Sequence, residues 1–158
     1  MIPVWLLVVV LLVAVVAVLG IWLSGTASRL NRLHIRTDSA RLNLEGALQA
    51  RGAVIGVLRP DLQQAAARAG GVALRAEEMG ARSDAENALV RTLTVGERTN
   101  PAFVEASTKV DLAARFYNDA VGDTLGLRSR PVVRMFRLAG SAPLPAYYDA
   151  MSGGDGTQ

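Results

Sequence analysis

The chain opens with an unbroken run of apolar residues. Residues 2–23 contain no charged side chain, and as an α-helix they would be about 33 Å long, enough for a hydrocarbon core of about 30 Å. Trp5 and Trp22 lie near the two ends of the run, where aromatic side chains meet the membrane interfaces. Pro3 stands at the start, where a helix accepts proline without losing a hydrogen bond. We therefore predict a transmembrane helix over residues 2–23.

A cleaved signal peptide is the alternative for this segment. No basic residue precedes it, and its apolar run exceeds the roughly 7–15 residues of a signal-peptide core, whereas Gly25-Thr26-Ala27 would serve as a cleavage sequence. Arg29 and Arg32 follow the run, and only the amino terminus precedes it. The positive-inside rule then places the N-terminus outside and the body of the chain in the cytoplasm. We expect a single-pass protein of the plasma membrane.

Beyond a short hinge predicted at residues 24–28, apolar residues return in alternating steps of three and four. Such a heptad pattern is typical of a helix that packs in a coiled-coil-like bundle. The pattern ends before Pro60, because proline disfavours a helical conformation at the residue that precedes it. The predicted seam of this first bundle helix is Leu30, Leu33, Thr37, Ala40, Leu44, Ala47, Arg51, Val54 and Leu58.

Two further long helices are predicted. Residues 61–93 are rich in Ala, Arg and Glu, but Gly70-Gly71 interrupts them and indicates a kink, a short break or a close helix crossing. Asn100 and Pro101 are a typical cap and first residue of a third helix, which runs to about residue 127. Its predicted seam is Phe103, Ser107, Val110, Ala114, Tyr117, Val121 and Thr124. The predicted fold is all-α, with the transmembrane helix followed by a long antiparallel three- to four-helix bundle over residues 29–140.

The stretch RFYNDAV, residues 115–121, sets two aromatic residues side by side on the third helix. Neighbours on a helix point about 100° apart, so the two rings cannot face one core. Tyr117 belongs to the seam, whereas Phe116 falls on a second row with Leu112, Ala120 and Leu127. That row needs a flanking helix, the C-terminal tail or another subunit. The candidate packing and interface residues here are Leu112, Phe116, Tyr117, Asn118 and Asp119.

Arg51 occupies a seam position, where a guanidinium without a partner is costly to bury. If the three helices run up, down and up from the membrane, the first and third are parallel. Arg51 then lies at about the height of residue 122, and we predict that it pairs with Asp119 or Asp123. The alternative is that its side chain extends along its stem to water.

The C-terminal region changes character at residue 128. Residues 128–140 form a basic amphipathic stretch, which could cap the bundle, contact a neighbouring subunit or lie on a membrane. An up-down-up bundle would put residue 127 far from the bilayer, which favours the first two. Residues 141–150 carry Tyr147 and Tyr148 among prolines and should lie extended along a groove. Residues 151–158 are Gly-rich and are predicted to be disordered.

Composition narrows the chemistry. The chain of 158 residues has no cysteine and one histidine, His34, with no Glu-x-x-His spacing. We therefore predict no catalytic, cofactor-binding or metal site and no enzymatic activity. The acids at 77–78 and 84–86 are interpreted as solvated faces. Basic residues exceed acidic ones only by 17 to 14, without interleaved aromatic residues, so no nucleic-acid partner is expected.

These residues together resemble the bacterial LemA family. RFYNDAV and the proline-aromatic end PLPAYYDA, residues 143–150, are similar to that family's two C-terminal motifs. Residues 31–55 resemble its first cytosolic helix, with Arg51 matching a family arginine, and AENAL at residues 85–89 adds a short central match. The resemblance implies a membrane-anchored helical bundle without an agreed enzymatic activity.

The expected function is a non-enzymatic, membrane-anchored scaffold that self-associates or organises other membrane proteins. Its expected partners are the lipid bilayer, further copies of the chain and another membrane protein. The alternative is an adaptor or regulator of a membrane protease or of an envelope-stress pathway, in which self-assembly is incidental.

Overall fold

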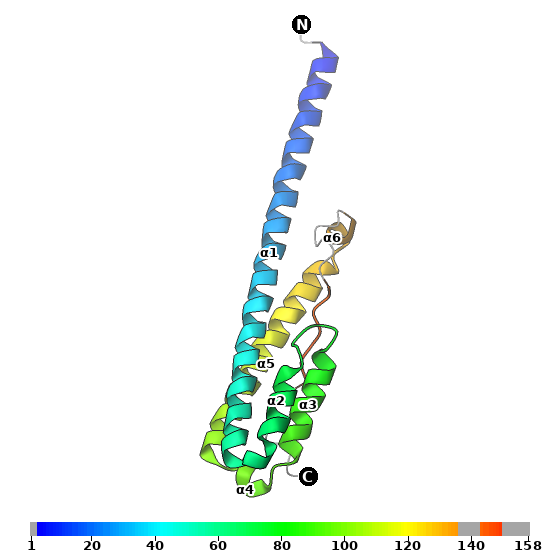
Figure 1. Cartoon of the computed structure of the whole chain (residues 1–158). Coiled ribbons are helices and arrows are strands. Elements are labelled where there is room, and N and C mark those ends of the chain that lie inside the picture. The colour runs from blue at the N-terminus through cyan, green and yellow to red at the C-terminus, as the bar shows by residue number, and fades with distance from the viewer. Residues whose placement is uncertain (1–2, 136–142, 150–158) are drawn as a thin grey trace, which may run out of the picture.

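The structure is a computed structural model, and it describes residues 3–135 and 143–149. The described residues form helices and connections without any β-strand, so this part of the chain is all-α, as predicted. Figure 1 shows one helix that extends far beyond a compact helical body. The elements in chain order are α1 (Val4–Leu58), η1 (Pro60–Leu62), α2 (Gln63–Gly71), α3 (Met79–Arg91), α4 (Val95–Arg98), α5 (Pro101–Arg128) and α6 (Pro131–Met135).

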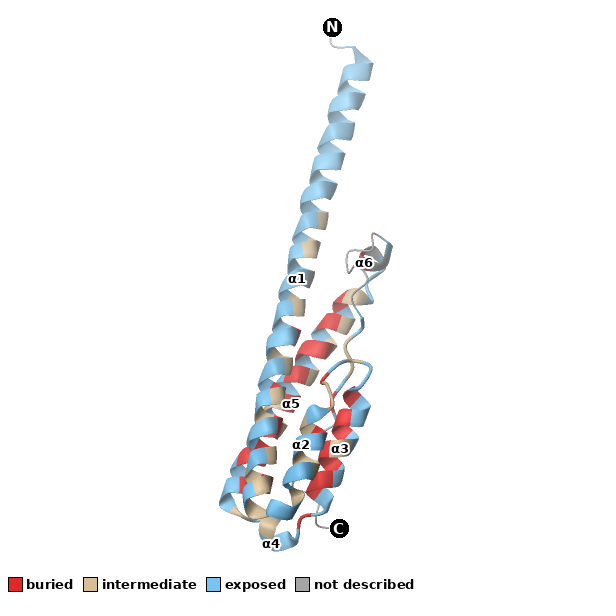
Figure 2. Ribbon diagram, viewed as in Figure 1, coloured by how far each residue is buried: buried red, intermediate tan, exposed pale blue. Residues whose placement is uncertain are grey.

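Helix α1 combines the apolar segment and the first bundle helix in one rod of 55 residues. Near the N-terminus it contains a stretch long and apolar enough to cross a membrane, and none of that stretch is buried in the protein (Figure 2). The hinge predicted at residues 24–28 is absent, because α1 continues through it. A single glycine among Ser, Thr and Ala costs a helix about 1 kcal/mol, and the Thr26 hydroxyl donates a helical hydrogen bond of 3.0 Å to the Trp22 carbonyl.

The segment predicted as the second helix forms two helices, α2 and α3. Helix α1 ends at Leu58, before Pro60, and the chain turns through η1 into α2. Helix α2 ends at Gly71, at the predicted break, and residues 72–78 form a loop that leads into α3. The loop therefore takes seven residues that the sequence pattern assigned to the second helix.

This additional reversal sets the direction of α5. Helix α5 begins beside the end of α1 and returns along it toward the N-terminus (Figure 1). Ile55 and Phe103 share one hydrophobic cluster at one end of the pair, and Thr37 and Thr124 are hydrogen-bonded at 3.0 Å near the other. Helices α1 and α5 are thus antiparallel, whereas an up-down-up bundle of three helices had predicted them parallel.

The direction of α5 also changes the position of the basic stretch after it. Leu127 of α5 and Val133 of α6 are buried against Leu33, at the end of the bundle that faces the apolar segment of α1. Residue 127 therefore lies at the near end of the bundle and not at the predicted distal end. Residues 136–140 and the predicted disordered residues 151–158 lie outside the described residues.

The core follows the predicted seams. Every predicted seam residue of α5 is buried, and Asn100 caps the helix by accepting a 3.0 Å hydrogen bond from the Ala102 amide. On α1, the seam residues from Leu33 to Val54 alternate between half-buried and buried positions, and Leu58 is half-buried. The buried residues of the main cluster are Leu44, Leu48, Leu74, Met79, Val110, Ala114, Tyr117, Val121 and Tyr148, and those of the lower cluster are Ile55, Leu89, Val90, Leu93 and Phe103.

Candidate functional site: the tail groove and the two faces of α5

Residues 143–149, which we call the tail, run between α3 and α5 without helix or strand (Figure 1). On the α5 side, the side-chain amide of Asn118 forms hydrogen bonds with both the backbone carbonyl and the backbone amide of Tyr148. Its Nδ2 donates to the Tyr148 carbonyl at 2.9 Å, and its Oδ1 accepts from the Tyr148 amide at 2.9 Å. The Tyr117 hydroxyl donates to the Ala146 carbonyl at 2.8 Å. Two neighbouring side chains of α5 thus hold three backbone groups of the tail.

Helix α3 supplies the opposite wall of this tail groove. The Asp149 amide donates to Ser83 Oγ at 3.2 Å, and Asn87 Nδ2 donates to the Asp149 carbonyl at 3.2 Å. At the other end of the tail, Arg128 Nη1 donates to the Pro143 carbonyl at 3.1 Å. All these hydrogen bonds go to the main chain of the tail. The groove therefore recognises an extended backbone, and the tail links α3 to α5.

One tail side chain enters the core. Tyr148 is only 2% exposed and packs in the main cluster, whereas its neighbour Tyr147 is 57% exposed. Tyr147 instead lies over α5, with its hydroxyl 3.6 Å from the position that a Cβ on Gly122 would take. Because successive side chains of an extended segment point to opposite sides, one tyrosine anchors the tail and the other covers it.

A buried ionic cluster lies beside the Tyr148 ring. Glu86 accepts from Arg51 Nη2 at 3.3 Å and from Arg82 Nε at 3.1 Å, and all three side chains are at most 3% exposed. Arg82 Nη1 also donates to the carbonyls of Gly70 and Val72, at 2.8 and 2.6 Å. The cluster therefore joins α1, α3, the end of α2 and the loop that follows it.

The predicted partners of Arg51 were wrong. Because α5 is antiparallel to α1, Asp123 lies beside Arg36, with which it forms an exposed ion pair at 2.7 Å, and Asp119 is exposed. The alternative, a guanidinium that reaches water, is also wrong, since Arg51 is 2% exposed. Sequence reasoning missed Arg82 and placed Glu86 on a solvated face. The signal was their spacing of four on a helix face shared with Met79 and Val90, both buried.

Burial changes the acid-base behaviour of this region. It raises the pKa of Tyr148 to about 12, because the loss of hydration on burial disfavours the phenolate more than the nearby Arg51 charge stabilises it. Burial likewise raises the pKa of Asp111, against the opposing effects of Arg51 and Arg115. The Tyr148 hydroxyl has no hydrogen-bond partner among the described residues. The buried phenol therefore stays protonated at neutral pH.

The opposite face of α5 is open. Phe116 and Leu112 are 58% and 53% exposed, whereas the other two members of their predicted row, Ala120 and Leu127, are buried. The four residues of the predicted row therefore belong to two different surfaces, one exposed and one buried. Phe116 and Leu112 line a groove of about 620 Å³, which we call the α1/α5 groove; its other lining residues are Arg36, Ser39, Ala40, Asn43, Ala47, Lys109 and Ala113.

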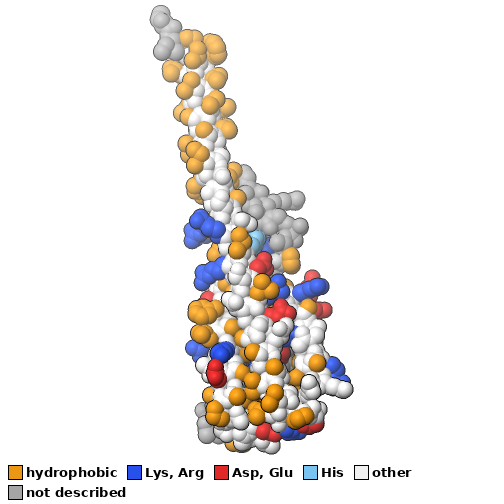
Figure 3. All heavy atoms as spheres, turned by 60° about the vertical axis from the view of Figure 1, so that its left-hand side comes forward, with side chains coloured by type: hydrophobic (Ala, Val, Ile, Leu, Met, Phe, Trp, Pro, Cys, Tyr) orange, Lys and Arg blue, Asp and Glu red, His pale blue; other side chains and the backbone are white. Residues whose placement is uncertain are grey.

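The predicted membrane anchors lie along the free part of α1. Trp5 and Trp22 are exposed within the apolar segment, and Arg29 and Arg32 are exposed just after it. Figure 3 shows the hydrophobic side chains that surround this segment and continue as separate patches down the bundle. Within residues 3–135 and 143–149, no three His, Cys, Asp or Glu side chains form a group that could hold a metal ion.

Replacing Asn118 by alanine tests the tail groove. N118A removes both hydrogen bonds to Tyr148, each worth about 0.5–1.5 kcal/mol, so hydrogen exchange of the tail amides in the full-length chain should accelerate about tenfold or more. The exposed neighbour provides the control, and D119A should leave exchange unchanged. Equal tail protection in N118A and the parent would show that Asn118 does not hold the tail.

Replacing Glu86 by glutamine tests the ionic cluster. E86Q leaves two buried guanidinium groups without a carboxylate and should lower the free energy of unfolding by about 3–5 kcal/mol, measured by thermal or denaturant unfolding in detergent. The matched control is E105Q, since Glu105 forms an exposed pair with Lys109 and should change stability by about 0.5 kcal/mol or less. Equal losses in the two variants would contradict a buried cluster.

The raised pKa of Tyr148 predicts a loss of stability in alkali. The unfolded phenol ionises near pH 10, and the folded phenol stays protonated until about pH 12. The folded state should thus lose about 2–3 kcal/mol relative to the unfolded state as pH rises through this interval. Y148F should lack that loss, and at pH 7 it should be no less stable, because the hydroxyl has no partner. Y147F, at an exposed site, should lose the same stability in alkali as the parent. If Y148F lost as much stability as the parent over this pH interval, the assignment of the loss to Tyr148 would be refuted.

Comparison of the chain with protein-family models, with curated proteins and with solved structures finds no match. What the site does therefore has to follow from the geometry of its own residues.

Proposed function

We propose that the chain is a non-enzymatic, membrane-anchored scaffold that self-associates through the α1/α5 groove. In this proposal the apolar segment of α1 crosses the plasma membrane once, with the N-terminus outside and the bundle in the cytoplasm. The observation that supports self-association is the exposure of Phe116 and Leu112 beside a groove, on a bundle whose core is already filled by the predicted seams. Exposed apolar surface of this kind commonly marks a protein interface.

Membrane anchoring restricts how two copies can meet. Copies inserted in the same direction can form a closed dimer only about an axis perpendicular to the bilayer, so α1 of one copy lies parallel to α1 of the other. The exposed side of α1 adjoining the groove carries Ile35 and Leu42, both more than half exposed. Gly46 follows them one turn later, and a Cβ there would meet nothing within 4 Å. The fold itself gives no reason for this helix glycine, whereas a closely approaching second helix would.

The proposed lack of enzymatic activity is supported by the use of the buried polar groups. Glu86, Arg51 and Arg82 bind one another and backbone carbonyls, and Asn118 binds the tail. The resemblance of residues 31–150 to the LemA family supports the same architecture, and membership of that family is part of this proposal.

An adaptor or regulator of a membrane protease or an envelope-stress pathway is the second candidate. The tail groove favours it, because a groove that binds backbone atoms could accept an extended segment of a partner protein in place of the tail. The two candidates differ in what purifies from native membranes. A scaffold should purify as assemblies of this chain. An adaptor should purify as a single copy of this chain bound to a second protein in fixed stoichiometry.

A charged residue in the groove tests self-association. F116D should lower the mass of the detergent-extracted full-length protein to that of one copy, because association would bury an unpaired carboxylate, as measured by light scattering or mass photometry. V104D places the same charge at another exposed apolar position of α5, outside the groove, and should keep the parental mass. A monomeric parent, or an unchanged mass in F116D, would refute this interface.

A further inference from the structure

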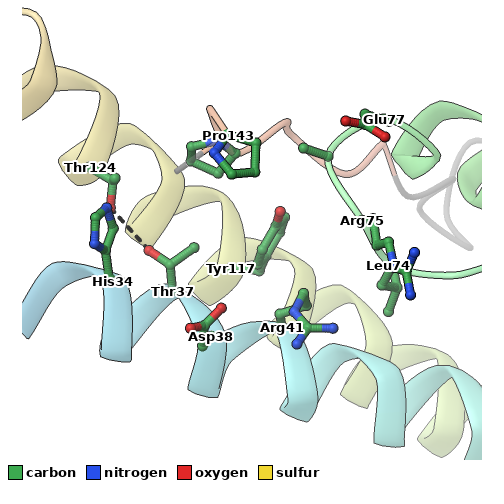
Figure 4. A pocket seen from close by; sticks show the side chains of 12 residues that line it. His34, Thr37, Asp38, Arg41, Leu74, Arg75, Glu77, Tyr117, Thr124 and Pro143 are labelled. Atoms are coloured by element: carbon green, nitrogen blue, oxygen red, sulfur yellow. Dashed lines mark hydrogen bonds between the residues drawn. The ribbon is translucent and has the colours of Figure 1, made fainter. Parts of the chain in front are cut away.

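A second cavity of about 620 Å³ lies on the tail side of the bundle and is assembled from four separate segments (Figure 4). Its volume falls in the range of sites that hold small molecules. Helix α1, helix α5, the loop at residues 72–78 and the tail each form part of its wall. The lining includes His34, Asp38 and Arg41 of α1, Tyr117 of α5, Leu74, Arg75 and Glu77 of the loop, and Pro143 and Pro145 of the tail.

His34 contributes a shielded ring nitrogen to one wall of the cavity. His34 Nε2 is screened from solvent and has no hydrogen-bond partner among the described residues. The hydroxyls beside it are already engaged, since Thr37 and Thr124 bond each other and the carbonyls of Leu33 and Ala120. The atoms around this nitrogen close it off from the cavity, so the ligand contacts proposed below do not include it.

Four charges of both signs surround the same space. Arg41 and Arg75 are the cations, and Asp38 and Glu77 are the anions. None of the four takes part in any of the ion pairs formed among the described residues. An anion alone would meet two repelling carboxylates here, and a cation alone would meet two guanidinium groups. A ligand that carries both charges is the complement of this set.

The remaining wall is apolar. Leu74 is buried, and Pro143, Pro145 and the ring of Tyr117 complete the surface. We propose that this cavity binds a small zwitterion with a short apolar body, of the class of a free amino acid or a short peptide. Its carboxylate binds Arg41 and Arg75, its ammonium group binds Asp38, and its apolar body lies against Leu74 and the tail prolines.

The same zwitterionic chemistry occurs in the headgroups of aminophospholipids, and the geometry favours the soluble source. Along α1, His34 lies 11 residues beyond the end of the apolar run at Leu23, or about 16 Å at 1.5 Å per residue. The interfacial region of each leaflet is only about 6 Å thick, half the difference between the whole bilayer and its hydrocarbon core. The cavity thus opens beyond the headgroup layer.

Ligand binding and docking of the tail are coupled in this site. Tyr117 lines the cavity and also donates its hydroxyl to the Ala146 carbonyl, while two tail prolines form part of the wall. With the tail undocked, the cavity loses that wall. A bound ligand should therefore stabilise the docked tail, and release of the tail should weaken binding to the same extent.

The test uses the full-length chain in nanodiscs of phosphatidylglycerol, which has no ammonium group. Isothermal titration calorimetry compares leucine and leucyl-leucine with 4-methylpentanoate and 3-methylbutylamine, which keep the apolar body of leucine but only one of its charges. We expect at least one zwitterion to bind saturably and about tenfold or more tighter than either single-charge analogue. Hydrogen exchange of residues 143–149 should slow when it binds. Absence of saturable zwitterion binding, or equal binding of an analogue, would overturn the proposal.

Variants and lipid composition complete the test. R41Q and D38N should each weaken binding about tenfold, N118A should weaken it by releasing the tail, and R29Q, outside the cavity on the same helix, should leave it unchanged. Equal affinity in R41Q, D38N and R29Q would overturn the site. Phosphatidylethanolamine added to the nanodisc should not compete with the zwitterion, and competition would overturn the assignment to a soluble ligand.

Discussion

The architecture depends on one buried carboxylate. Glu86 compensates two guanidinium groups from different helices, and Arg82 then reaches the carbonyls that end α2. Since the C-terminal end of a helix carries partial negative charge, this arginine completes α2 as well as pairing with Glu86. Contacts of α1 with α2 and of α2 with α3 would leave the position of α3 along the bundle loosely defined, because apolar side chains pack at several registers. The directional bonds of the cluster favour the register that the structure shows.

The tail completes what the helices leave open. Helices α3 and α5 stand on opposite sides of it, and its backbone groups accept or donate the hydrogen bonds that join them. Helix α5 consequently has distinct faces with distinct tasks. Tyr117 and Asn118 face the tail, whereas Phe116 and Leu112 line the groove on the other side. The adjacent aromatic residues Phe116 and Tyr117 thus lie on two different faces of α5.

Local sequence rules predicted the helices, and they failed where a long-range choice decided the outcome. The seam of α5, its Asn100 cap and the end of α1 before Pro60 follow from periodicity and proline or capping chemistry that act within a few residues. The hinge was mispredicted because small polar residues tolerate both a turn and a helix. The partner of Arg51 was missed because Gly70-Gly71 could mark either a kink or a full reversal. That single choice sets the direction of α5 and therefore every long-range pair along it.

The uninterrupted α1 rod has a mechanical consequence. A flexible joint at residues 24–28 would let the bundle turn independently of the apolar segment, but a continuous helix does not. Each residue of an α-helix advances 1.5 Å and rotates about 100°. The number of residues between Trp22 and Ile35 therefore sets both the distance of the bundle from the apolar segment and the direction in which each groove faces. A tilt or rotation of the apolar segment is therefore passed on to the bundle through the continuous helix.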